Sequence, residues 1–316
     1  MNRPINRIAI IGTGVIGASW AALFLAKGRK VAATDPAPGA EKALRHYVET
    51  AWPALEQLGL TPGASQSNLT FTTDLATCVA DADLVQENGP ERIDFKQNLY
   101  GQLDELLPPD VIIASSSSGL TMSSIQEGCK LHPERCVIGH PFNPPHLIPL
   151  VEIVGGSKTS EDTIERAAQF YTSIGKRTVR LHKELSGHVA NRLQAAVMRE
   201  VYYLVGEGVL SVADVDTALC WGPGLRWGIM GQVLLNHLGG GEGGMGHFLD
   251  QFTGPITAWW KALGSPELTP ELRQKLIDGV HAEVGSRSIQ ELAEERDRIL
   301  LGLLALRTGP GKSNPA

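Results

Sequence analysis

Short apolar runs alternate with helix-like segments along residues 7–181 of the chain. The segments between the runs place apolar side chains at helical spacing, as Phe95, Leu99 and Leu103 do within residues 94–107. Strands that alternate with helices predict an α/β fold, a doubly wound and largely parallel sheet. The runs read as buried strands are Arg7–Ile11, Lys30–Thr34, Leu69–Thr73, Asp83–Glu87, Val111–Ala114, Leu147–Val154 and Arg177–Leu181.

The pattern changes near residue 185. From Ser186 onward apolar residues recur at helical spacing and no further run alternates as a strand would. We therefore predict two domains, residues 1–185 with the sheet and residues 186–316 with helices alone. Within the second domain, the glycine-rich residues 222–246 are expected to form a helix–loop–helix that lines a pocket, and residues 307–316 a frayed tail.

A glycine-rich turn joins the first strand to the first helix. Gly12 permits the tight turn, Gly14 lets backbone approach a pyrophosphate, and Gly17 allows close helix–strand packing. Val15 and Ile16 open the helix, whose N-terminus is expected to point at the phosphates. A G-x-G-x-x-G pattern flanked by a strand and a helix predicts a Rossmann-like dinucleotide-binding domain in residues 1–185.

Asp35 ends the second strand, about 20 residues beyond the glycine motif, where such folds carry an acidic residue. A carboxylate there accepts hydrogen bonds from the adenosine ribose hydroxyls and repels a 2′-phosphate, which favours NAD over NADP. The alternative is an ordinary strand–helix–strand unit that binds no nucleotide.

Residues 139–156 contain a histidine and a carboxylate twelve positions apart. His140 leads a proline-rich turn, so we expect its imidazole on a stiff loop. Glu152 lies in an apolar run, where a charge needs a partner, and only His140 and His146 are titratable neighbours. A His–carboxylate pair orients an imidazole for general-base work. The alternative is that Glu152 faces water at a strand edge and His140 is merely packed.

Three polar groups are expected to follow strands. They are residues 87–91, the serine cluster Ser115–Ser118, and His140. Because ligands of a doubly wound sheet bind at the carboxyl ends of its strands, these groups are expected to meet on one rim. The serines could instead be no more than a flexible turn.

Composition excludes several functional classes. The 316 residues carry a net charge of -6 and a pI near 5.9, which leaves no basic surface for nucleic acid. No run approaches the roughly 20 apolar residues that cross a membrane, and the first residues do not resemble a signal peptide. The four cysteines form no C-x-x-C pair, which suits a reducing cytoplasm, and neither they nor the nine histidines have metal-ligand spacing, so no metal is expected.

These motifs, in this order, resemble those of the 3-hydroxyacyl-CoA dehydrogenase family over nearly the whole chain. The family's H-x-F-N-P turn matches residues 140–144, its following glutamate Glu152, and its V-x-N-R-L helix residues 189–193. Its serine matches Ser118 within A-S-S-S-S-G-L. The resemblance implies an NAD-dependent dehydrogenase that acts as a homodimer.

The resemblance also implies residue roles. An E-x-x-x-x-K pair near the nicotinamide end of NAD matches Glu91 and Lys96, and Ser118 and Asn143 are further expected cofactor contacts. His140 would remove the proton from a C3 hydroxyl while Glu152 holds the imidazole. Ser118 and Asn191 would hydrogen-bond the substrate oxygen as it becomes a carbonyl.

One stretch departs from the acyl-CoA enzymes. Where they carry G-P-F-E-x-x-D, this chain has P-G-L-R-W-G-I-M-G at residues 223–231, followed by a G-G-x-x-G-M-x-H-F pattern at 240–248. Both are more similar to the branch with L-gulonate 3-dehydrogenase, lambda-crystallin and L-carnitine dehydrogenase, which implies a small free 3-hydroxy acid as substrate. Arg226 and Trp227 are then expected to bind substrate, Arg226 through the carboxylate.

Three alternatives stay open at this point. Arg226 could be structural, stacked on Trp221 or Trp227. The enzyme could act on CoA thioesters, as the wider family does. Finally, the chain could be a non-catalytic NAD-binding structural protein, as lambda-crystallin suggests; the joint presence of Ser118, His140, Glu152 and Asn191 argues against this last reading.

Overall fold

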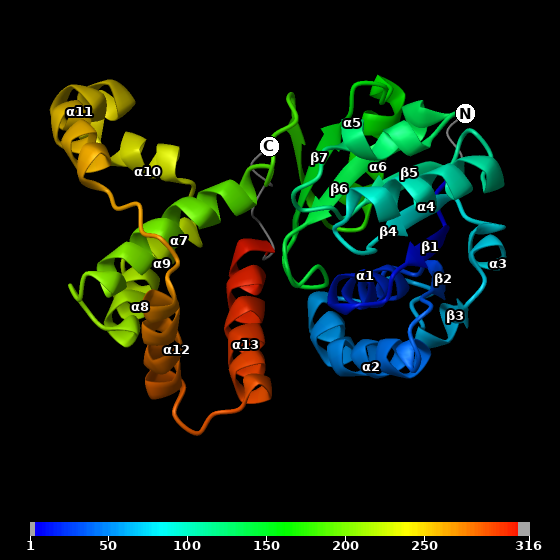
Figure 1. The fold of residues 1–316 in the computed structure, drawn as a ribbon, viewed down its shortest axis with the longest axis horizontal. Coiled ribbons are helices and arrows are strands. Elements are labelled where there is room, and N and C mark those ends of the chain that lie inside the picture. The colour runs from blue at the N-terminus through cyan, green and yellow to red at the C-terminus, as the bar shows by residue number, and fades with distance from the viewer. Residues whose placement is uncertain (1–3, 309–316) are drawn as a thin grey trace. The chain divides into compact units, whose positions relative to one another are not determined.

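A computed structural model describes residues 4–308 (Figure 1). The chain divides into two compact units, the first ending at Arg192 and the second beginning at Leu193. The domain boundary predicted near residue 185 stays a prediction. Each unit is described by itself below.

The first unit is built on one eight-stranded sheet. The strand order is β3-β2-β1-β4-β5-β6-β7-β8, and every neighbouring pair is parallel except β6 and β7. The predicted α/β, doubly wound and largely parallel fold is therefore confirmed. The strands are β1 (Arg7–Ile11), β2 (Lys30–Thr34), β3 (Leu69–Thr72), β4 (Leu84–Glu87), β5 (Ile112–Ser115), β6 (Cys136–Pro141), β7 (Leu150–Gly155) and β8 (Arg177–Leu181).

Helices cover both faces of this sheet. Side chains alternate across each strand, so Ile8 and Ile10 of β1 enter one core while Ala9 and Ile11 enter the other. The helices are α1 (Val15–Ala26), α2 (Ala40–Leu58), α3 (Leu75–Val79), α4 (Ile93–Leu106), α5 (Met122–Ile125) and α6 (Glu161–Ser173), with short 3₁₀ helices η1 (Gln66–Asn68), η2 (Gln126–Gly128) and η3 (Pro133–Arg135).

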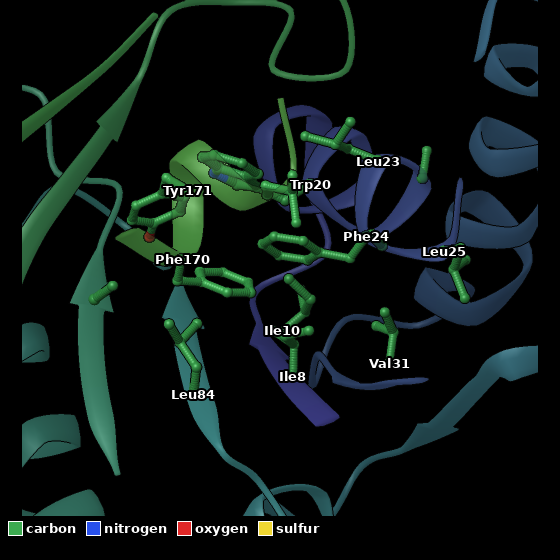
Figure 2. Packing of buried hydrophobic residues seen from close by; sticks show 14 of the residues in the cluster. Ile8, Ile10, Trp20, Leu23, Phe24, Leu25, Val31, Leu84, Phe170 and Tyr171 are labelled. Carbon is green, nitrogen blue, oxygen red and sulfur yellow. The ribbon is translucent and has the colours of Figure 1, made fainter. Parts of the chain in front are cut away.

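The larger core lies under α1, α2 and α6, and aromatic rings dominate its centre (Figure 2). Trp20 stacks on Phe24 with ring centroids 5.2 Å apart, and Tyr171 lies 5.4 Å from Trp20. The second core lies under α3, α4 and α5. The sheet thus has an apolar core on each of its faces.

The second unit has helices and no strand in its described residues, 193–308, as predicted. Side-chain caps fix where two of its helices begin. The hydroxyl groups of Ser211 and Thr269 accept hydrogen bonds from the backbone N–H groups of Asp214 and Leu272, respectively. Its helices are the body of α7 (Ala190–Gly206), α8 (Val212–Trp221), α9 (Pro223–Trp227), α10 (Gln232–Gly239), η4 (Gly241–Gly243), α11 (Gly244–Ala262), α12 (Pro270–Val284) and α13 (Ile289–Thr308).

The prediction of a frayed tail from residue 307 is wrong for residues 307 and 308. Helix α13 continues through Thr308. The remainder of that prediction, residues 309–316, lies outside the described residues. In residues 4–308 no helix is both long and apolar enough to cross a bilayer.

Candidate active site

His140 lies in strand β6 and not on a loop, so the prediction of a loop-borne imidazole was wrong. Pro141, the last residue of β6, explains why: a residue that precedes proline is pushed towards extended geometry, which is the geometry of a strand. The turn begins only after Pro141, and β7 begins at Leu150 instead of the predicted Leu147. The antiparallel register then places His140 directly opposite Glu152.

The two side chains form a buried pair. The Nδ1 atom of His140 lies 2.8 Å from Oε2 of Glu152, and the residues are 4% and 2% exposed. The reading in which Glu152 faces water is therefore excluded. Because an ionised carboxylate only accepts hydrogen bonds, Nδ1 carries the imidazole proton and Nε2 keeps a free lone pair. His146, the other candidate partner, instead lies 2.8 Å from Oγ of Ser19.

The second oxygen of Glu152 holds the start of helix α7. Oε1 accepts the backbone N–H groups of Val189 and Ala190 at 2.8 and 3.0 Å. Burial by itself raises the pKa of Glu152, but hydrogen bonds from His140, Ala190 and Val189 outweigh it and hold the pKa below its usual value. The carboxylate is thus ionised and fully occupied, and it fixes both the imidazole and the first turn of α7.

Ser118 faces the free nitrogen of His140. Its Oγ lies 3.1 Å from Nε2, and unlike the imidazole it is exposed. The hydroxyl and the imidazole lone pair therefore meet at a point that solvent and small molecules reach. Ser118 is the serine of the cluster that the resemblance indicated.

Glu91 fixes the serine turn, which is not a flexible one. Its Oε1 accepts from Ser117 Oγ at 2.6 Å and from the backbone of Gly119 and Leu120 at 2.7 and 3.2 Å. Burial raises the pKa of Glu91, and these hydrogen bonds, with the nearby Lys96 charge, lower it further than burial raises it. The predicted convergence of three polar groups on one rim is thus seen in the contacts among residues 91, 117, 118 and 140.

Lys96 has a nearer partner than the one expected. Its Nζ lies 2.7 Å from Oε1 of Glu87 and 3.8 Å from Oε2 of Glu91. Glu87 also accepts from Ser115 Oγ at 2.6 Å, and both members of the Lys96–Glu87 pair are buried. The family pattern of residues 91 and 96 could not show this, because Glu87 reaches Lys96 from the end of the neighbouring strand β4.

The glycine motif has the shape that a dinucleotide requires. Gly12 has a φ of +82°, and a Cβ there would lie 2.8 Å from the backbone oxygen of Asn88. A Cβ on Gly17 would lie 1.9 Å from the oxygen of Gly12, whereas one on Gly14 would meet nothing within 4 Å. Helix α1 starts at Val15 without a side-chain cap. Its first amides are thus left for a ligand, and the open space over Gly14 suits a pyrophosphate.

Asp35 closes the same turn. Its Oδ2 accepts from the amide and hydroxyl of Thr13 at 2.7 and 3.1 Å, and Oδ1 accepts from the amide of Ala37 at 2.9 Å. The carboxylate is therefore held at the end of β2 beside the glycine turn. The donors and the shape present fit NAD.

The remaining predicted residues are placed only in part. Asn143 is exposed just beyond β6, and Asn191 follows the amide that Glu152 holds, as the second residue of α7. Arg226 and Trp227 are exposed on α9 of the second unit, where the indole of Trp227 donates to Oε1 of Gln232. Their roles stay predictions.

His188 is a site residue that the sequence did not indicate. It is 1% exposed, its ring centroid lies 5.0 Å from that of His140, and its Nε2 lies 2.9 Å from the carbonyl oxygen of Ser117. A single histidine between a glycine and a helix has no recognisable pattern. Within residues 4–308 no cluster of three or more His, Cys, Asp or Glu side chains is placed to hold a metal.

Two family models match the chain. The model described as 3-hydroxyacyl-CoA dehydrogenase, NAD binding domain, covers residues 7–185, and that of the C-terminal domain covers residues 187–275. The chain belongs to the 3-hydroxyacyl-CoA dehydrogenase family. It is therefore an NAD-dependent oxidoreductase.

Curated relatives narrow the comparison. An L-carnitine dehydrogenase from Pseudomonas sp. is 48% identical over 309 residues, which are 98% of this chain and 96% of the relative. An L-carnitine dehydrogenase from Bacillus cereus is 47% identical and covers 96% of this chain and 92% of its own.

Solved structures agree on the fold. A structure of 5-formyl-3-hydroxy-2-methylpyridine 4-carboxylic acid 5-dehydrogenase, an NAD⁺-dependent dismutase, aligns with a TM-score of 0.82 at 30% identity, covering 96% of this chain and 98% of the other. The 3-hydroxybutyryl-CoA dehydrogenase from Escherichia coli K12 aligns with a TM-score of 0.64 at 29% identity, covering 75% of this chain and 50% of its own.

Proposed function

We propose that the enzyme oxidises the C3 hydroxyl of L-carnitine, or of a closely similar free 3-hydroxy acid, to the 3-keto acid. The observation that carries the chemistry is the geometry of His140, with Nδ1 bound to Glu152 and Nε2 facing an exposed hydroxyl. L-carnitine is supported as the substrate because L-carnitine dehydrogenases are nearly half identical to this chain over almost its whole length. The 223–231 segment, which departs from the acyl-CoA pattern, supports a free acid over a thioester.

His140 acts as the general base through Nε2, which takes the proton of the C3 hydroxyl. The imidazole becomes a cation beside an ionised Glu152. The negative charge of Glu152 stabilises this cation because the pair is buried. Ser118 donates a hydrogen bond to the substrate oxygen, and Asn191 supports the same oxygen from the first turn of α7. NAD, when bound, supplies the carbon that accepts the hydride from C3. The residues that would hold NAD are 12–17, Asp35, Glu91, Lys96, Ser118 and Asn143.

Arg226 would bind the substrate carboxylate, since a planar guanidinium matches a carboxylate through two parallel hydrogen bonds. Trp227, its neighbour on α9, would line the same part of the substrate site. We expect Arg226→Met to raise the KM for the hydroxy acid by about tenfold, the scale of a lost hydrogen bond to a charged group, with the KM for NAD unchanged. An unchanged KM for the acid would instead favour a structural Arg226 stacked on Trp221 or Trp227.

The substrate is tested by following NADH formation with L-carnitine, L-gulonate, 3-hydroxybutyrate and an aromatic 3-hydroxy acid, and NADH consumption with acetoacetyl-CoA. The proposal predicts the highest kcat/KM with L-carnitine. The highest kcat/KM with the thioester would contradict the free-acid proposal. NAD binding without turnover of any of these would favour a structural protein.

We further propose that the enzyme is a cytoplasmic homodimer. All four cysteines are free thiols, as in proteins of reducing compartments. Large apolar side chains such as Ile229, Val233 and Leu238 are exposed on the second unit, and burying them against a second copy of the chain would favour association. Light scattering coupled to gel filtration should give twice the chain mass of 33.9 kDa; a single chain mass at micromolar concentration would contradict the dimer.

A further inference from the structure

We propose that His188 is a positioning residue that holds the carbonyl of Ser117 and thereby places the Ser118 hydroxyl against His140. The inference rests on the function proposed above, in which Ser118 and His140 share the substrate oxygen. Four observations within the first unit support it.

The first observation is the contact itself. A backbone carbonyl only accepts hydrogen bonds, so the 2.9 Å contact makes Nε2 of His188 the donor to the oxygen of Ser117. That donor fixes the plane of the peptide that joins Ser117 to Ser118. Glu91 holds the same turn from its other side through Ser117 Oγ and the amides of Gly119 and Leu120. Ser118 therefore stands on a turn that is anchored on both sides.

The second observation is a cost. With Nε2 protonated and the ring neutral, Nδ1 is an acceptor, and it is buried without a hydrogen-bond partner. Burying an unpaired acceptor costs about 1–3 kcal/mol, so an apolar side chain would serve packing better. The residue thus contributes something that packing alone does not require, and its donated hydrogen bond is the contribution that the structure shows.

The third observation is the backbone. His188 has a φ of +48°, in the left-handed region that few non-glycine residues adopt, and Gly187 before it has a φ of +76°. This conformation leads directly into the amides of Val189 and Ala190 that Glu152 accepts. The segment that carries His188 is therefore held to the same carboxylate that holds His140.

The fourth observation is charge. Burial lowers the pKa of His188, and the neighbouring His140 lowers it further. The hydrogen bond to the Ser117 carbonyl raises this pKa, as do the negative charges of Glu152 and Glu91, but together they offset the lowering only in part. His188 thus stays neutral beside His140, and it adds no second positive charge when His140 takes up the substrate proton.

The test compares two variants of similar size in the full-length enzyme. His188→Leu removes the donor, whereas His188→Gln keeps an amide N–H near the position of Nε2. We expect His188→Leu to lower kcat by about three- to tenfold, the range for one hydrogen bond, and His188→Gln to stay within about twofold of the wild type. The melting temperature should change little in either variant.

Wild-type kcat in a folded His188→Leu variant would overturn the proposal, and so would equal losses in both variants, which would indicate packing alone. NMR of ¹⁵N-labelled histidine gives an activity-independent readout: we expect a neutral ring protonated at Nε2, and a ring protonated at Nδ1 would overturn the proposal. His140→Ala, run alongside, reports on the base itself. Full activity in that variant would refute the proposed function and leave the NMR result to decide on His188.

Discussion

Strand β6 has a buried pair of ionisable side chains at each end, and the two pairs differ in what they contact. Arg135 immediately precedes the strand and pairs with Asp104 at 3.0 Å, and both side chains are 2% exposed. His140 lies near the other end and pairs with Glu152 at 2.8 Å, also buried. Burial and distance are thus nearly the same in the two pairs, but Arg135 carries a permanent charge and His140 does not.

The difference lies in what else each pair contacts. Asp104 accepts the backbone amides of Lys130, Leu131 and His132, and Arg135 donates to the carbonyls of Leu107 and Pro108. That pair ties α4 to the chain entering β6. The His140–Glu152 pair leaves one nitrogen facing an exposed hydroxyl. A buried pair therefore becomes a candidate for chemistry when one of its atoms remains available to a ligand.

The largest effect is expected from Glu152→Gln. The amide oxygen can still accept from Val189 and Ala190, but the amide NH₂ would face Nδ1 of His140 and force its proton onto Nε2. The imidazole then cannot accept a proton, and an analogous change in a Ser-His-Asp triad costs about 10⁴-fold in kcat. Steady-state kinetics should show a loss approaching that size with the melting temperature nearly unchanged. A kcat within tenfold of the wild type would mean that Glu152 does not set the tautomer.

At the other end of β6, Asp104→Ala should act on stability instead. It leaves the Arg135 charge buried without its partner, which typically costs about 3–5 kcal/mol. Urea unfolding should show this loss, while kcat per folded molecule should remain that of the wild type. Glu105→Ala, exposed and adjacent on α4, is the matched control and should change the free energy of unfolding by no more than about 0.5 kcal/mol. If Asp104→Ala changed the free energy of unfolding no more than Glu105→Ala does, the Arg135–Asp104 pair would not have the stabilising role that distinguishes it from the His140–Glu152 pair.

Acid should reveal a smaller difference. Burial raises the pKa of Asp104, but its backbone and Arg135 hydrogen bonds lower it more, so the folded pKa lies below that of the unfolded chain, about 3.9. Its stabilising contribution is therefore complete above that value and is lost as pH falls through the folded pKa. Between pH 5 and about pH 3, Asp104→Ala should lose less unfolding free energy than the wild type. Parallel curves for the two proteins would contradict this assignment.

Much of the first unit could be predicted from the sequence, because short apolar runs that alternate with helix-like segments, and a glycine-rich turn, are local signals. The residues at the strand ends were also predicted, since each follows an apolar run. The placement of His140 was missed because the prolines were read as a turn led by His140, whereas Pro141 is the last residue of a strand and keeps His140 extended.

The contacts that support the site could not be predicted. Glu87 reaches Lys96 from a neighbouring strand, Glu152 holds amides 37 and 38 residues away, and His188 contacts a carbonyl 71 residues away. Such contacts depend on strand order and register, which no local pattern specifies. The substrate side of the site depends on residues 222–246, whose composition predicted helices but not what they bind.

The most direct test of the account is the turnover of His140→Ala with L-carnitine and NAD, set beside His132→Ala. His132 also contacts a glutamate, Glu134 at 3.1 Å, but it lies on the half-exposed surface before β6 and serves as the matched control. The account predicts that His140→Ala loses about 10²–10⁴-fold in kcat with an unchanged Kd for NAD, and that His132→Ala keeps wild-type kcat. Equal turnover by the two variants would contradict the assignment of His140 as the base.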